Sequence, residues 1–176
     1  MPQTDFHHRH ALWRAYLYVD LADECTESRR DRGLHEAHMD SAMLHARIAI
    51  QRIFEWLKRK SPPGWKQWYD SKCAQYPGIA HFKEHRDYNV HESATKVGQV
   101  VYPDTIGIKT PPPPRPAKDH YYFPKSPYAG LNPSQTPAID FVRAYLADVE
   151  SFVFAADKKY RFNTHAISPL SSTTNP

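Results

Sequence analysis

The sequence predicts an all-α protein, an antiparallel four- to five-helix bundle with one Pro-rich excursion and one short extended, hairpin-like segment. Apolar residues recur every three or four positions over several long segments, as on one face of a helix. Clusters of Pro and Gly separate these segments. The chain is 40% hydrophobic and 13% aromatic, enough for one core in 176 residues. We expect a single domain over residues 9–162, an excursion at about 103–136 and a disordered tail at 163–176.

The first helix is expected at about residues 9–25. Residues 1–8 are predicted to form a flexible lead, and the polar run His7–His10 to be a mobile stretch rather than a ligand set. Apolar positions at helical spacing mark the buried face, and two larger side chains widen it: Leu12, Tyr16, Val19 and Ala22, with Trp13 and Leu17 beside them.

A longer helix is expected from about Leu34 to Lys60, after a polar turn at Thr26–Gly33. Lys58, Arg59 and Lys60 suit a helix C-terminus, and the Pro62–Gly64 segment ends the helix. The repeat of apolar residues covers five turns: Met39, Met43, Ala46, Ile50, Ile53 and Leu57.

A short third helix is predicted at Trp65–Gln75, with Trp65, Trp68 and Tyr69 on its core side. Pro77 and Gly78 are expected to break the chain before a fourth helix that begins near Ile79.

Gly98–Tyr102 is apolar and β-branched, which favours a short strand or an extended edge. The aromatic run His120–Phe123 is expected to fasten the Pro-rich excursion onto the bundle.

The last helix is predicted to end at about Tyr160. Thr136 suits the N-cap, and Pro137 suits the first helical position. Its apolar face is Ile139, Val142, Leu146, Val149, Phe152 and Val153.

The composition also sets expectations about partners and location. A formal charge of +4 is compatible with a polyanionic partner. The two cysteines, Cys25 and Cys73, form no CxxC motif, which is typical of reduced thiols in a cytoplasmic protein. The sequence has neither a signal-peptide pattern nor a run of 18 apolar residues, so no contact with a membrane is expected.

The segment from Arg86 to His91 carries the residues with the clearest potential for catalysis. A guanidinium can hold a phosphate through two hydrogen bonds. A histidine can move a proton near neutral pH. Asp87 and Asn89 lie between the two and could orient the site. These residue types are the minimum that RNA cleavage without a metal or other cofactor requires.

This segment resembles the signature of the HEPN superfamily, in which four to six residues separate an Arg from a His. The resemblance implies a helical bundle, frequent homodimers and, in many members, metal-independent endoribonuclease activity. It also implies a toxin-like or stress-response role, with RNA as substrate and an antitoxin or regulatory protein as a further partner. The resemblance is detailed only over Arg86–His91, and it extends to the order of helices over residues 9–160.

Position and geometry limit this interpretation. The same spacing occurs at Arg30–His35 and Arg115–His120, but only Arg86 lies late in a helical region before the final helix. Residues five apart on a regular helix point about 140° away from each other. Arg86 and His91 therefore share a pocket only if the helix ends near Asn89 or if a second subunit completes the site.

Two other function classes remain open. His81 and His85, four residues apart on one helix face, would hold a divalent metal if His38, His45 or Glu36 supplied a third ligand. Such a site would resemble the DinB-like metal-dependent bundles. The second alternative is a non-catalytic helical module that binds nucleotides or a protein.

Overall fold

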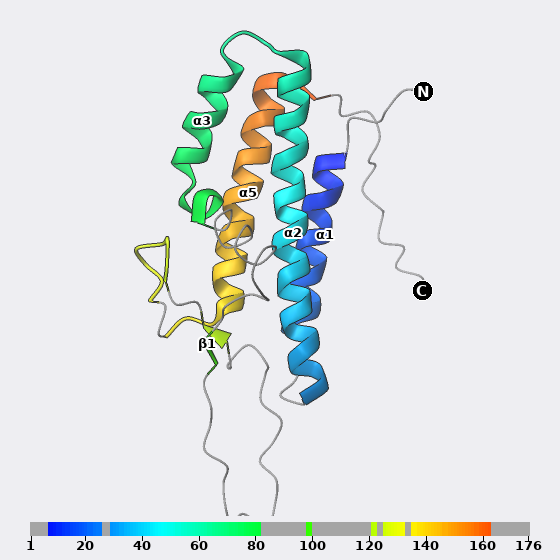
Figure 1. Ribbon diagram of the computed structural model, residues 1–176, viewed down its shortest axis with the longest axis vertical. Coiled ribbons are helices and arrows are strands. Elements are labelled where there is room, and N and C mark those ends of the chain that lie inside the picture. The colour runs from blue at the N-terminus through cyan, green and yellow to red at the C-terminus, as the bar shows by residue number, and fades with distance from the viewer. Residues whose placement is uncertain are drawn as a thin grey trace, which may run out of the picture.

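The computed structural model describes residues 7–25, 29–81, 98–99, 121–122, 125–132 and 135–162 (Figure 1). These residues form an all-α helical bundle, which confirms the predicted fold class. The Pro-rich excursion falls largely outside the described residues, and the tail at 163–176 falls wholly outside them.

The helices run in two opposite directions (Figure 1). Helix α1 (His7–Asp23) and helix α2 (Arg29–Lys60) form an antiparallel pair, and α3 (Trp65–Gln75) runs back on the far side of the last helix from α2 in this view. Helix α5 (Ala138–Tyr160) runs in the same direction as α2. Strand β1 (Gly98–Gln99) pairs antiparallel with β2 (Tyr121–Tyr122), with Gly98 opposite Tyr122.

Helix α5 supplies the largest share of the core. Its buried face combines the stripe that the sequence predicts with small and aromatic residues between those positions. Burying one large apolar side chain contributes about 1.5–3 kcal/mol, so this face is a major source of stability. Its buried residues are Ala138, Ile139, Phe141, Val142, Tyr145, Leu146, Val149, Phe152, Val153 and Ala156.

The predicted stripe on α2 is confirmed, but the helix begins at Arg29 rather than near Leu34. The expected turn at Thr26–Gly33 is therefore wrong for residues 29–33. Arginine is a good helix former, and the negative charge of Asp31 in the first turn interacts favourably with the positive end of the helix dipole. His35 is fully buried, and its Nδ1–H donates a hydrogen bond to the Ala22 carbonyl at 2.8 Å, which ties this early turn to α1.

The start of α1 also differs from the prediction. His8 is 4% exposed, so the expected mobile stretch is ordered helix from residue 7. Trp13 and Leu17 do not widen the buried face, because they are 58% and 40% exposed. The buried stripe instead continues backwards from Leu12 to His8, which is one helical turn earlier.

The boundaries set by Pro and Gly are close to the prediction. Helix α3 covers the predicted residues, and Trp65, Trp68 and Tyr69 pack partly buried against the core. Helical structure resumes at Pro77 itself, because Pro suits a first helical position, and is described to residue 81. Pro137, not Thr136, is the N-cap residue of α5, and its carbonyl accepts the first helical hydrogen bond, from the Asp140 N–H.

Within the described part of the chain, no helix combines the length and apolar character needed to cross a bilayer.

Candidate functional site

The residues of the Arg-to-His segment, Arg86, Asp87, Asn89 and His91, lie outside the described residues, as does His85. The helical stretch that precedes them is described as far as His81. Their role in catalysis therefore stays a prediction.

A carboxylate of α5 anchors the chain on either side of this region. One oxygen of Asp148, Oδ2, accepts hydrogen bonds from the Gly78 N–H at 3.0 Å and from the Tyr128 hydroxyl at 2.9 Å. Burial, the hydrogen bond and the charge of Asp148 together raise the pKa of Tyr128, so the phenol stays protonated and donates. Residues 78 and 128 thus meet at one point on α5, although fifty positions separate them in the sequence. We call this contact the Asp148 junction.

The structure places two of the suggested metal ligands against α1. The rings of His38 and His45 both stack on Tyr18 of that helix, at centroid distances of 5.9 and 5.3 Å. No three His, Cys, Asp or Glu side chains form a metal-binding group within the residues that the structure describes. The pair His81 and His85 is untested, because His85 is not among those residues.

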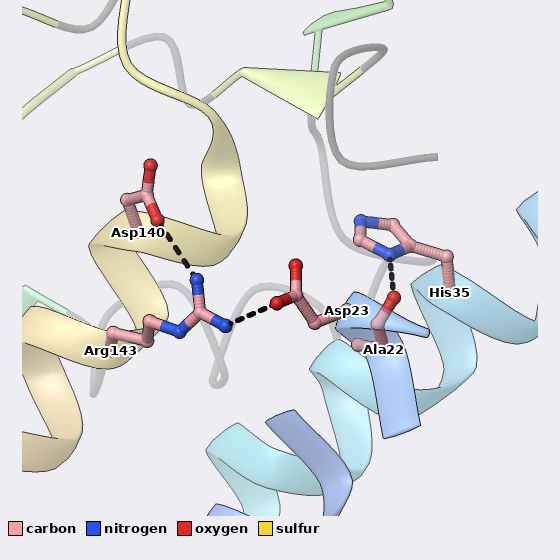
Figure 2. Close-up of polar contacts among 5 residues, drawn as sticks. All are labelled: Ala22, Asp23, His35, Asp140 and Arg143. Atoms are coloured by element: carbon pink, nitrogen blue, oxygen red, sulfur yellow. Dashed lines mark hydrogen bonds and ion pairs between the residues drawn. The ribbon is translucent and has the colours of Figure 1, made fainter. Parts of the chain in front are cut away.

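A polar cluster joins the end of α1 to the start of α5 (Figure 2). Arg143 donates to Asp23 at 2.8 Å and to Asp140 at 3.2 Å. Burial alone would lower the pKa of Arg143, but the two carboxylates outweigh it and raise that pKa. The Arg143 side chain is 40% exposed and pairs with carboxylates of both helices, so the cluster fixes the helix ends. We assign it a structural role.

The opposite end of the bundle contains a more buried ion pair. His8 Nε2 lies 3.0 Å from Asp157 Oδ1, and Arg9 lies 2.7 Å from Oδ2. Burial would raise the pKa of Asp157, but hydrogen bonds from His8 and Arg9, with their charges, lower it overall. The His8 ring also packs on Phe162 at 5.1 Å, and Phe162 packs on Trp56 at 4.5 Å. The start of α1 is thus fixed to the ends of α2 and α5.

Exposed cations surround this anchored end. Because α2 and α5 run in the same direction, their basic last turns lie at the same end of the molecule, where α3 begins (Figure 1). The Lys159 ammonium lies 5.4 Å from the ring centroids of both Trp68 and Tyr160, so cations and aromatic rings are neighbours here. We call this region the basic end. Its exposed residues are Lys58, Arg59, Lys60, Lys66, Lys158, Lys159 and Arg161.

Sequence reasoning identified the basic run at residues 58–60 but not the basic end as a whole. Lys58–Lys60 and Lys158–Arg161 are about a hundred residues apart, and only the parallel course of α2 and α5 brings them together. Basic residues in the last turns of two helices that run in the same direction are the signal that could have indicated it.

Comparison with known proteins identifies no relative. The chain matches no protein-family model, and neither the curated proteins nor the solved structures contain a significant match to it.

Proposed function

We propose that this protein acts on RNA as a HEPN-like helical bundle, and that Arg86 and His91 perform metal-independent cleavage. The all-α bundle is the fold that the resemblance implies. The observation that carries the proposal is the basic end, because a polyanion requires a surface of this kind.

The electrostatics of the basic end favour an extended anion. Lysines in a last helical turn offset the negative end of their own helix dipole. Here two such turns combine with Lys66 and Arg161, so the positive charge exceeds what one helix end requires. Asp157, the buried carboxylate nearest to them in the sequence, is already paired with His8 and Arg9. Asp157 therefore does not neutralise the exposed lysines of the basic end.

The chemistry proposed for the motif is acid–base cleavage. His91 takes the proton from the 2′-hydroxyl or gives one to the leaving 5′-oxygen. Such a group is worth about 10²–10⁴-fold in rate. Arg86 stabilises the charge that develops on the phosphate oxygens, and Asp87 or Asn89 orients the pair. The 2′-hydroxyl attacks phosphorus, so one product carries a 2′,3′-cyclic phosphate. A homodimer would bring two copies of the motif together around one axis.

The test is RNA cleavage by the purified protein in excess EDTA. We expect His91→Ala and Arg86→Ala each to lower the rate by at least about 100-fold. His85→Ala is the matched control, since it removes a histidine six positions away and should leave the rate unchanged. If cleavage instead requires a divalent metal and depends on His85 and His81, the metal-dependent alternative replaces the proposal.

Measurements of RNA binding distinguish the proposed nuclease from the alternative, a non-catalytic binding module. The double variant Lys60→Glu, Lys159→Glu should weaken RNA binding and reduce its dependence on salt, because it removes phosphate contacts. If the parent protein binds RNA through these lysines but releases no cyclic-phosphate product under any condition, the binding module is the correct function. Lack of any RNA binding by the parent rules out both.

A further inference from the structure

The outer seam between α1 and α2 presents rings and cations in two facing rows. On α1, His10, Arg14 and Tyr18 are four residues apart and therefore share one face. On α2, His38, His45 and Arg52 are seven residues apart and also share one face. Tyr18 connects the rows, because its ring stacks on both histidines of α2. We call this surface the α1–α2 seam.

The rings of the seam are arranged in stacks. Tyr18 and His45 are almost parallel, with an interplanar angle of 9°, and Tyr18 and His38 differ by 27°. On the outer face of α1, His10 stacks on Trp13 at 5.7 Å and 15°. Trp13 points about 140° away from Tyr18, so it adjoins the seam through His10 and does not face α2. Even with this contact, Trp13 is 58% exposed in the described part of the chain, a large ring area for a tryptophan. Flat, exposed rings of this kind provide stacking surfaces for other planar groups.

The seam is also positively charged. Burial lowers the pKa of His45, and the neighbouring Arg14 and His10 lower it further. A neutral His45 at pH 7 retains both a hydrogen-bond donor and an acceptor. Arg14 on α1 and Arg52 on α2 are both exposed, and because the two helices are antiparallel, both lie on the side of the ring stack nearer the basic end. An incoming group that combines negative charge with planar rings would match this surface.

The row on α2 continues into the basic end. Arg59 follows Arg52 by seven residues on the same face and belongs to the basic end. At 1.5 Å per residue, the row from His38 to Arg59 is about 32 Å long. Helix α2 extends past the start of α1 at this end (Figure 1), so its row of residues leads from the seam to the basic end.

We infer that the α1–α2 seam and the adjoining outer face of α1 bind single-stranded RNA, with bases stacked on Trp13 and phosphates held by Arg14 and Arg52. The inference rests on the proposed function and specifies its substrate class. Single strands are favoured over duplex RNA because paired bases are already stacked on each other, whereas unpaired bases can stack on protein rings. The length of the row suits a strand of several nucleotides.

The test compares the binding of a labelled oligouridylate of about ten nucleotides with that of a duplex of equal length. Fluorescence anisotropy should show tighter binding of the single strand by the full-length protein. Trp13→Ala should weaken that binding by about 5- to 150-fold, the value of one base stacked on a ring. Trp13→Phe should restore most of the affinity. Phe154→Ala is the matched control, since Phe154 is 69% exposed on α5 and should have no effect.

Salt dependence tests the phosphate contacts separately. Arg52→Gln should reduce the slope of log affinity against log salt by about 0.7, the contribution of one contact to a single strand. Lys125→Gln, an exposed cation on the segment 125–132, should leave the slope unchanged. Thermal melts of each variant establish that the fold is intact, as expected for exposed positions.

The outcomes distinguish the inference from the proposed function. If the parent cleaves RNA but Trp13→Ala and Arg52→Gln bind as tightly as the parent, only the inference about the seam is wrong. If Trp13→Ala converts a dimer into monomers without changing RNA affinity, the seam is a subunit interface. A preference for duplex RNA that Trp13→Ala does not change would also overturn the inference. If the parent neither binds nor cleaves RNA, both proposals fail.

Discussion

The Asp148 junction predicts an unusual result for the substitution Gly78→Ala. Gly78 lies in a helical turn, where Ala is ordinarily the better residue. A Cβ at this position would overlap the Tyr128 hydroxyl and would lie 2.8 Å from Asp148 Oδ2. Tyr128 must therefore move away, and its hydrogen bond to Asp148 is lost.

The expected magnitude follows from these two opposing effects. A hydrogen bond to a carboxylate contributes about 1.5–3 kcal/mol. Replacing Gly by Ala in a helix returns about 0.5–1 kcal/mol. Gly78→Ala should therefore lower the free energy of unfolding by about 1–2 kcal/mol, which corresponds to a Tm about 2–8 °C lower for a chain of this size.

The assay is urea unfolding of four proteins in a double-mutant cycle: the parent, Gly78→Ala, Tyr128→Phe and the combination. Tyr128→Phe removes both the bond and the overlapping oxygen, so Gly78→Ala should cost less in that background, where the close contact with Asp148 Oδ2 remains. Gly33→Ala is the control for helix propensity. Gly33 lies in α2, and a Cβ added there would meet no described atom within 4 Å, so this variant should gain about 0.5–1 kcal/mol.

The reasoning fails if Gly78→Ala costs as much in the Tyr128→Phe background as in the parent. In that case the added methyl group would conflict with the helix or with Asp148, and the Tyr128 hydroxyl would have no part in the loss. Stabilisation of the parent by Gly78→Ala would be a stronger contradiction, because it would mean that the junction is not formed in solution.

Two further predictions concern the ends of the bundle. Because the pKa of Asp157 is lower in the folded state, its ion pairs stabilise the fold above about pH 4, the usual aspartate pKa, and this contribution is lost as pH falls through the lower folded value. Asp157→Asn should therefore lower the free energy of unfolding by about 1–3 kcal/mol at pH 7. The urea midpoint of this variant should also fall less steeply than that of the parent as the pH is lowered. If the two midpoints fall in parallel down to about pH 2.5, the prediction is wrong. At the other end, His35→Ala should cost about 2–4 kcal/mol because His35 is fully buried, whereas Arg143→Gln should cost less than about 1 kcal/mol because the arginine is half exposed. In 1 M salt the loss of stability caused by Arg143→Gln should disappear, whereas that caused by His35→Ala should remain. A larger loss for Arg143→Gln than for His35→Ala would refute these assignments.

The parts of the fold that the sequence predicts are those with a local signal. Pro62–Gly64 and Pro77 set the limits of α3, and the apolar repeat with Pro137 sets those of α5. The start of α2 was missed because a polar residue, His35, occupies a core position there and its partner is a backbone carbonyl. Periodicity of apolar residues cannot indicate such a contact.

The polar contacts between helices could not be predicted for a different reason. His8 and Asp157 are 149 residues apart in the sequence, and Arg143 and Asp23 are 120 apart. No spacing rule links such pairs, and only the order and direction of the helices bring them together. The Arg86–His91 pattern is the opposite case, since its residues are neighbours in sequence and their geometry depends on local structure.

The long separation of α2 and α5 along the chain affects how the protein folds. Residues 7–60 can form the α1–α2 pair early, but much of the core of that pair is completed by α5, whose first residue follows Lys60 by 78 positions. During synthesis, the apolar face of the α1–α2 pair that α5 later covers therefore stays exposed while the intervening segment is translated. Distant contacts slow folding relative to other helical bundles. We expect this protein to fold late in translation, and its α1–α2 pair to be the part that chaperones bind.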